Sequence, residues 1–192
     1  MQNIFLFLLF LVIQCSSVQY VKKNPTLKDD ISSTKRIAIV SAKDSNISKN
    51  EYFMLHDMLR QEISHHTLFI VYKAPTKFKN ICSKEFPKVE GVLIAEMKEY
   101  SEASKSKFEL KAALRKCSTD STIWSAKVAD KFSLEANKEL SLVKGYVGKY
   151  GDSVANKVNA FFQLSKDLVS ELQGPEKLSE EEELEKIEVE SE

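Results

Sequence analysis

The sequence predicts an α/β protein with one mixed sheet of about five strands, packed by helices from its C-terminal part. Three observations support this class. An apolar run is followed by an amphipathic helical pattern and a second apolar run. Three strand-like segments then follow one another through short turns, and two helical patterns come last. Strand-helix-strand, an antiparallel meander and C-terminal helices together give one sheet covered by helices.

Residues 1–14 are typical of a signal peptide. Residues 4–13 are all Ile, Leu, Phe or Val, and none of residues 1–14 has a charged side chain. The run is shorter than the roughly 20 apolar residues that cross a bilayer, and it suits a signal-peptide core. Cys15 and the polar residues Ser16 and Ser17 follow. This order resembles the lipobox of bacterial lipoproteins, which implies that Cys15 is lipidated and becomes the mature N-terminus.

Lipidation would make the membrane a partner of the chain. Each buried methylene contributes about 0.8 kcal/mol, and two or three acyl chains hold a protein far more firmly than one. Ser16 after the cysteine suits sorting to the outer membrane, on its periplasmic face or at the cell surface. Two alternatives stay open: a secretory signal that is cut near Ser16 and discards Cys15, and a retained apolar anchor.

The sequence divides the mature chain into three parts. Residues 15–35 are polar and contain one proline, so we expect a lipidated N-terminus and a flexible tether. Residues 36–174 are expected to form the single α/β domain. Residues 175–192 are expected to be an acidic disordered tail, or a helix that frays.

The acidic tail leaves a basic body. Residues 176–192 contain nine Glu and two Lys, a net charge of −7, while the whole chain has a net charge of zero. The tail could fold back on the basic body, repel an acidic surface or have no partner. The positive charge of the body is spread over lysines without an arginine cluster or interleaved aromatic residues. We therefore expect no binding of nucleic acid.

The first half of the expected domain reads strand, helix, strand. Residues 36–42 form a short apolar run, and residues 67–74 form another that ends at a proline. Ser48 and Glu51 between them make a capping box, which marks the start of a helix. The apolar stripe of that helix contains Tyr52, Leu55, Leu59 and Ile63, with Met54 and Met58 beside it.

The second half reads as a meander followed by two helices. Residues 89–97 are a strand, and the next strand alternates, with Phe108, Leu110, Ala112 and Leu114 on one face. Residues 121–130 are expected to be the third strand of the meander, with Trp124, Ala126 and Val128 on one face. Residues 137–150 are a weakly patterned helix, and residues 152–173 a strongly patterned one whose stripe is Val154, Val158, Phe161, Leu164 or Ser165, Leu168 and Leu172.

Five segments carry a family resemblance: RIAIVSA, LFIVYKAP, ICSKEFPKVEGVLIAEM, ALRKCSTDSTIWSAKV and NAFFQLSKDLVSEL. With this order of elements, the chain resembles the small domain of the TolB N-terminal region and of curli-secretion-type lipoproteins. It is similar in particular to uncharacterised lipoproteins of spirochaetes and myxobacteria. The resemblance implies a lipid-anchored envelope protein and no established activity.

Cys82 and Cys117 are an even pair beyond the lipobox, in a compartment that favours disulfides. If Met97 pairs near Lys107, Cys117 lies across from Pro87, and Cys82 on the connecting loop can reach it. The disulfide would stabilise the fold by about 4 kcal/mol in the chain-entropy model. The alternative is two free buried thiols, which behave as small hydrophobic groups.

The remaining candidates for chemistry are few. His56, His65 and His66 lack a third spaced ligand, so no metal site and no cofactor is expected. Trp124 is expected in the core, with a ligand platform as the alternative. Phosphate-loop, serine-hydrolase and zinc-protease motifs are absent. We therefore expect a non-enzymatic envelope lipoprotein that binds another envelope protein as an assembly or transport accessory. The alternative is a surface lipoprotein that binds host or environmental ligands.

Overall fold

The protein is built on one mixed sheet. The computed structural model describes residues 17–42, 45–73, 82, 88–102, 105–135 and 140–191. Six strands lie in the order β1-β6-β5-β4-β2-β3, with β2 parallel to β3 and β4 and the other neighbours antiparallel. The strands are β1 (Val18–Lys23), β2 (Arg36–Ser41), β3 (Ile70–Tyr72), β4 (Gly91–Glu102), β5 (Lys105–Lys116) and β6 (Ser121–Phe132). The predicted fold class is confirmed, with β1 as an additional strand.

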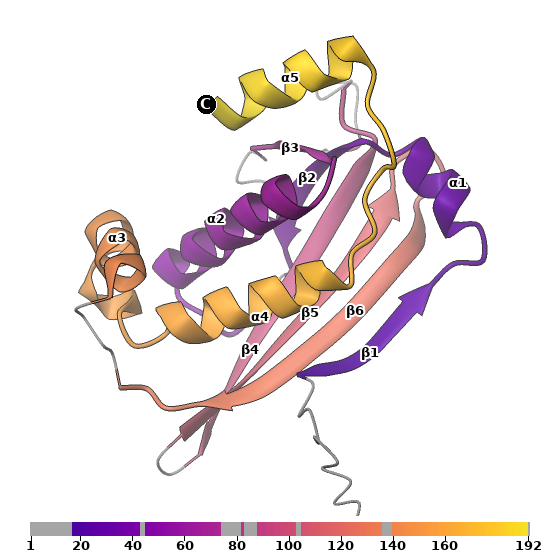
Figure 1. Cartoon of the computed structure of the whole chain (residues 1–192). Helices are drawn as coiled ribbons and strands as arrows, with labels where there is room; N and C mark the ends of the chain where they lie inside the picture. Colours follow the sequence, from indigo (N-terminus) through magenta and orange to yellow (C-terminus); the bar gives the residue numbers. More distant parts are fainter. Residues whose placement is uncertain are drawn as a thin grey trace, which may run out of the picture.

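The helices are α1 (Leu27–Ser32), α2 (Lys49–His66), α3 (Ser141–Tyr150), α4 (Val158–Ser170) and α5 (Glu180–Ser191). Helices α2, α3 and α4 lie on one face of the sheet, α1 connects β1 to β2, and α5 lies beside the edge strand β3 (Figure 1). Within the described ranges, no helix is both long enough and apolar enough to span a membrane.

Helix α2 begins where its capping box predicts. The Ser48 hydroxyl accepts a hydrogen bond from the Glu51 backbone N–H at 3.4 Å, and the Glu51 carboxylate accepts one from the Ser48 N–H at 2.7 Å. Lys157 Nζ also lies 2.6 Å from Glu51 and 2.6 Å from Glu99 on β4. The cap of α2 is therefore tied to the start of α4 and to the sheet.

The main core lies between the sheet and helices α2 and α4. Both predicted strand faces are buried, and so is the predicted apolar stripe of residues 152–173. Burial of each large apolar side chain contributes about 1.5–3 kcal/mol, so this layer is the main source of stability. The buried residues of these elements include Phe108, Leu110, Ala112, Leu114, Trp124, Ala126, Val128, Val154, Val158, Phe161, Leu164, Ser165, Leu168 and Leu172.

The predicted register of the β4–β5 hairpin is wrong. Met97 pairs with Leu110, whereas the sequence analysis placed it near Lys107. The ladder continues beyond the apolar part of both strands to the pair Glu102 and Lys105. The polar end of the hairpin gives no hydrophobic signal, so the turn was placed too early in the chain.

The C-terminal helical region has a break that the sequence pattern did not indicate. Residues Asp152–Val154 form a 3-10 turn, and α4 begins only at Val158. Gly151, at a φ of 88°, joins α3 to this turn in a conformation that glycine adopts more readily than other residues. The Trp124 indole N–H donates to the Glu171 carbonyl oxygen at 3.1 Å, which fixes Trp124 as a core residue beside the end of α4.

The expected flexible tether over residues 15–35 is wrong from Val18 onward. Strand β1 pairs with β6, and Leu27 and Ile31 of α1 are buried in the core. Val18 and Val21 pack against the same core. These few apolar residues stand in a polar segment, so their pattern was too weak to indicate a strand and a helix.

The expected disordered tail is also wrong over the described residues. Residues 180–191 form helix α5, which buries Val189 and lies along β3. Ser179 and Glu182 form reciprocal hydrogen bonds of 3.3 and 2.8 Å at its start. The acidic tail therefore folds back on the basic body, one of the outcomes that the sequence left open.

Candidate functional site

The predicted lipidation residue, Cys15, lies outside the described residues, but the chain is fixed two residues later. The Ser17 carbonyl oxygen accepts a hydrogen bond from the Ala129 N–H on β6 at 2.8 Å. The Ser17 hydroxyl donates to the Asp167 carboxylate on α4. The folded domain therefore starts almost directly after Cys15.

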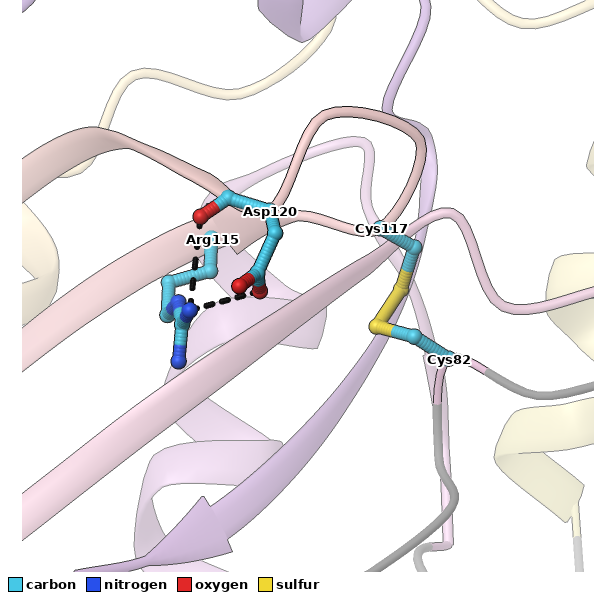
Figure 2. Close-up of a disulfide and its surroundings, with 4 residues drawn as sticks. All are labelled: Cys82, Arg115, Cys117 and Asp120. Atoms are coloured by element: carbon cyan, nitrogen blue, oxygen red, sulfur yellow. Dashed lines mark hydrogen bonds and ion pairs between the residues drawn. A yellow bond between two sulfur atoms is a disulfide. The ribbon is translucent and has the colours of Figure 1, made fainter.

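Cys82 and Cys117 form the predicted disulfide, with 5.2 Å between their Cα atoms (Figure 2). The residue across from Cys117 is not the predicted Pro87, because the Cys117 N–H donates to the Glu90 carbonyl oxygen at 2.8 Å. Pro87 itself lies outside the described residues. The bond ties the segment before β4 to the turn between β5 and β6. A small second core lies at this end of the sheet and contains Ala38, Val40, Val89 and Val92.

The turn beyond the disulfide has its own polar contact. Arg115 Nη2 lies 2.5 Å from Asp120 Oδ1 and 3.3 Å from the Asp120 carbonyl oxygen (Figure 2). Asp120 has a φ of 54°, which Asp adopts more easily than most residues. Because both cysteines are in the disulfide, neither is a free thiol that could act as a nucleophile.

The acidic helix α5 uses two glutamates to hold the start of β2. Glu185 Oε2 lies 2.7 Å from Arg36 Nη2, and Glu182 Oε2 lies 2.7 Å from Lys35 Nζ. The hydrogen bond from Arg36 lowers the pKa of Glu185 to about 2. Burial and the hydrogen bond to Glu185 raise the pKa of Tyr72 on β3 above its ordinary value. These contacts attach α5 to the edge of the sheet.

The second half of α5 is held by one cation of its own and by one from α2. Lys186 Nζ donates to the carbonyl oxygens of Ser64 and Phe69, each at 3.0 Å. Arg60 of α2 donates to the Val189 carbonyl oxygen at 2.5 Å. A helix lying against β3 protects a sheet edge that would otherwise be open to pairing with another chain.

The sheet face opposite the helices is lined with lysines. Exposure alternates along β5: Phe108 and Leu110 are buried toward the helices, whereas Lys105 and Lys111 are exposed. The ladder carries the same alternation onto the neighbouring strands. We call this surface the lysine face, and its cations are Lys22, Lys98, Lys105, Lys107, Lys111, Lys127 and Lys131.

Carboxylates on the lysine face are fewer and lie beside lysines. Lys98 Nζ is 2.5 Å from Glu96, and Lys127 Nζ is 2.7 Å from Glu109. Lys111 lies between Glu96 on β4 and Lys127 on β6 in the ladder. The surface as a whole is therefore positively charged, and the period-two pattern of lysines that forms it was visible in the sequence of β5.

The histidines are not brought together. His56 is partly buried, and burial lowers its pKa, while its Nε2 lies 2.8 Å from the Ile39 carbonyl oxygen. His66 lies 3.3 Å from Glu62, one turn earlier on α2. Among the described residues, no three His, Cys, Asp or Glu side chains are arranged to hold a metal ion.

No protein-family model and no curated protein matches the chain. Among solved structures, the PelC dodecamer from Paraburkholderia phytofirmans is similar, with 14% identity over 82% of this chain and 97% of that chain and a TM-score of 0.56. A substituted form of the same dodecamer has 13% identity over 81% and 97% and a TM-score of 0.53. Lipoprotein GNA1162 from Neisseria meningitidis has 16% identity over 65% and 98%, with a TM-score of 0.40. This chain therefore shares the fold of PelC.

Proposed function

We propose that this protein is a non-enzymatic envelope lipoprotein, attached to the membrane through lipid on Cys15, that serves as a binding module for another envelope component. The observation that carries the proposal is the junction at the N-terminus. An apolar signal run ends at Cys15, and the fold begins two residues later at Ser17. A lipid at that position would hold the domain directly against the membrane.

Two further features support an envelope location. The Cys82–Cys117 disulfide suits an oxidising compartment. The resemblance to TolB-type and curli-secretion-type lipoproteins points to the outer membrane of a bacterium, with spirochaetes and myxobacteria as sources of similar chains.

The structure weakens the support for the alternative, a surface lipoprotein that binds host or environmental ligands. The acidic tail is the only sequence feature that favours that alternative. Glu182 and Glu185 are instead engaged with Lys35 and Arg36 of the same chain. The accessory role therefore keeps the stronger support.

Lipidation is tested with the intact protein from cells. Mass spectrometry should find an N-terminal Cys15 that carries two or three acyl chains, and Cys15→Ala should accumulate as unprocessed or soluble precursor. The double variant Cys82→Ser with Cys117→Ser is the matched control and should keep the lipid. An unmodified N-terminus at Ser16 or later would refute the attachment.

The binding role is tested by photo-crosslinking in cells from the exposed side of α5. Leu184 and Ile187 are 68% and 65% exposed there. A photoreactive residue in place of Leu184 should give one discrete adduct with another envelope protein, and Cys15→Ala should abolish it. Absence of any adduct from Leu184, Ile187 and several positions on the lysine face would count against a binding module.

Self-assembly is a second candidate, because the PelC structure, which has a similar fold, is a dodecamer. The proposal is that several copies of this chain form one envelope assembly. Light scattering of the lipidated protein in detergent should then give a defined mass of several subunits. A monomer over a hundredfold range of concentration would exclude the self-assembled form.

A further inference from the structure

We propose that the lysine face docks on the anionic headgroups of the membrane that holds the lipid. This inference rests on the proposed attachment through Cys15 and adds the orientation of the domain. The proposal concerns the part of the open face formed by β4, β5, β6 and β1. None of the described helices covers that part (Figure 1).

The position of the anchor keeps the domain close to the membrane. The described chain begins at Ser17, two positions after Cys15, and two residue steps span at most about 7 Å. Ser17 is bonded to Ala129, which stands in β6 between Lys127 and Lys131 of the lysine face. The anchor therefore leaves the fold beside the proposed docking surface.

The distribution of charge favours one orientation. Helix α5 lies against β3, at the edge of the sheet opposite the anchored strand β1 (Figure 1). Its exposed glutamates include Glu180, Glu181, Glu183 and Glu188. An anionic bilayer attracts the lysine face and repels α5. Both effects turn the lysine face toward the membrane.

The shape of the face also suits a bilayer surface. Strands β4, β5 and β6 each have 12 residues and are about 40 Å long. Tyr100 stands on the same face opposite Lys107 and is 45% exposed. An aromatic ring with a polar tip among lysines suits the boundary between headgroups and acyl chains. Lysine side chains can extend their charged ends to the phosphates.

The test measures lysine reactivity in the full-length lipidated protein. The protein is placed in vesicles of phosphatidylcholine alone, or with phosphatidylglycerol, and labelled with an amine reagent. Attraction to the anionic surface would hold Lys111 and Lys107 against the headgroups, so both should react several-fold more slowly on the anionic vesicles than on phosphatidylcholine alone. Lys166, exposed on α4 on the helical side, is the matched control and should react equally on both.

Charge removal and salt complete the test. The variant Lys105→Gln with Lys131→Gln should restore much of the Lys111 reactivity on anionic vesicles, as should high salt. Equal Lys111 reactivity on both vesicles would overturn the proposal. Protection in detergent that increases with protein concentration would also overturn it, because a second copy would then cover the face. Mass analysis of Cys15 in the same sample shows separately whether the lipid attachment itself has failed.

Discussion

The Glu185 carboxylate, on the acidic helix α5, accepts two hydrogen bonds from Arg36 at the start of β2. Its Oε2 lies 2.7 Å from Arg36 Nη2 and 3.1 Å from Arg36 Nε. Both side chains are mostly buried, with 13% and 20% of their surfaces exposed. The same carboxylate accepts a hydrogen bond from the Tyr72 hydroxyl on β3. A segment with the composition of a disordered tail is therefore part of the packed structure.

Glu185→Gln should weaken the attachment of α5. Loss of the charge weakens hydrogen bonds to Arg36 and Tyr72, so the free energy of unfolding should fall by about 1–3 kcal/mol. Urea unfolding measures this change. Glu183→Gln removes the same charge from an exposed position of the same helix and should leave stability within about 0.5 kcal/mol of the parent. Equal effects of the two variants would contradict a specific role for Glu185.

The same pair predicts a loss of stability in acid. The pKa of Glu185 is lowered to about 2 in the folded protein, whereas its ordinary value is 4.5. A lowered pKa contributes stability fully above about pH 4.5, and this contribution is lost as the pH falls through about 2. The stability difference between the parent and Glu185→Gln should therefore be largest near pH 6 and shrink between pH 4.5 and 2. A constant difference across this range would show that Glu185 does not titrate as proposed.

Removal of residues 176–192 should destabilise the domain. The deletion exposes the β3 edge, removes buried Val189 and leaves Arg36 without two of its three carboxylate partners. Loss of the apolar burial and of the ion pairs should together cost about 2–4 kcal/mol in the free energy of unfolding. Thermal melting measures the loss, and size-exclusion chromatography should detect association through the uncovered edge. An unchanged melting temperature would mean that α5 is not docked in solution.

The Cys82–Cys117 disulfide should be detectable both by thiol labelling and by its effect on stability. Thiol labelling of denatured, unreduced protein should find neither Cys82 nor Cys117 free. The double variant Cys82→Ser with Cys117→Ser should lose up to about 4 kcal/mol of stability, because the bond closes a sequence separation of 35 residues. Reduction of the parent should give a similar loss, and full labelling without reductant would exclude the bond.

The parts of the fold that the sequence predicted are those where a strong local pattern coincides with burial. The Ser48 and Glu51 capping box located α2, and the alternation around Phe108 located β5. The hairpin register was missed because its polar end contributes no apolar pattern. Ser179 and Glu182 repeat the capping motif of α2, but the high acidity of the tail concealed a helix that depends on tertiary ion pairs to Lys35 and Arg36.

The candidate surfaces were less predictable than the core, because they depend on which strands become neighbours in the folded sheet. The disulfide could be predicted because the two cysteines beyond Cys15 leave a single pairing between them. The lysine face requires the order of the strands, since Lys111 and Lys127 become neighbours only when β5 pairs with β6. The position of Ser17 beside Ala129 depends on β1, whose apolar content was too low to reveal a strand.

The pairing of the first strand with the last has a consequence for the timing of biogenesis. Val18 pairs with Val128, so the segment after Cys15 has no partner strand until most of the chain has been made. At typical rates of about 5–20 residues per second, translation alone leaves an interval of several seconds. If Cys15 is lipidated as proposed, that interval leaves the nascent N-terminus accessible to the enzymes that would acylate and cleave it. Pairing of β1 with β6 is therefore expected to be a late step in folding.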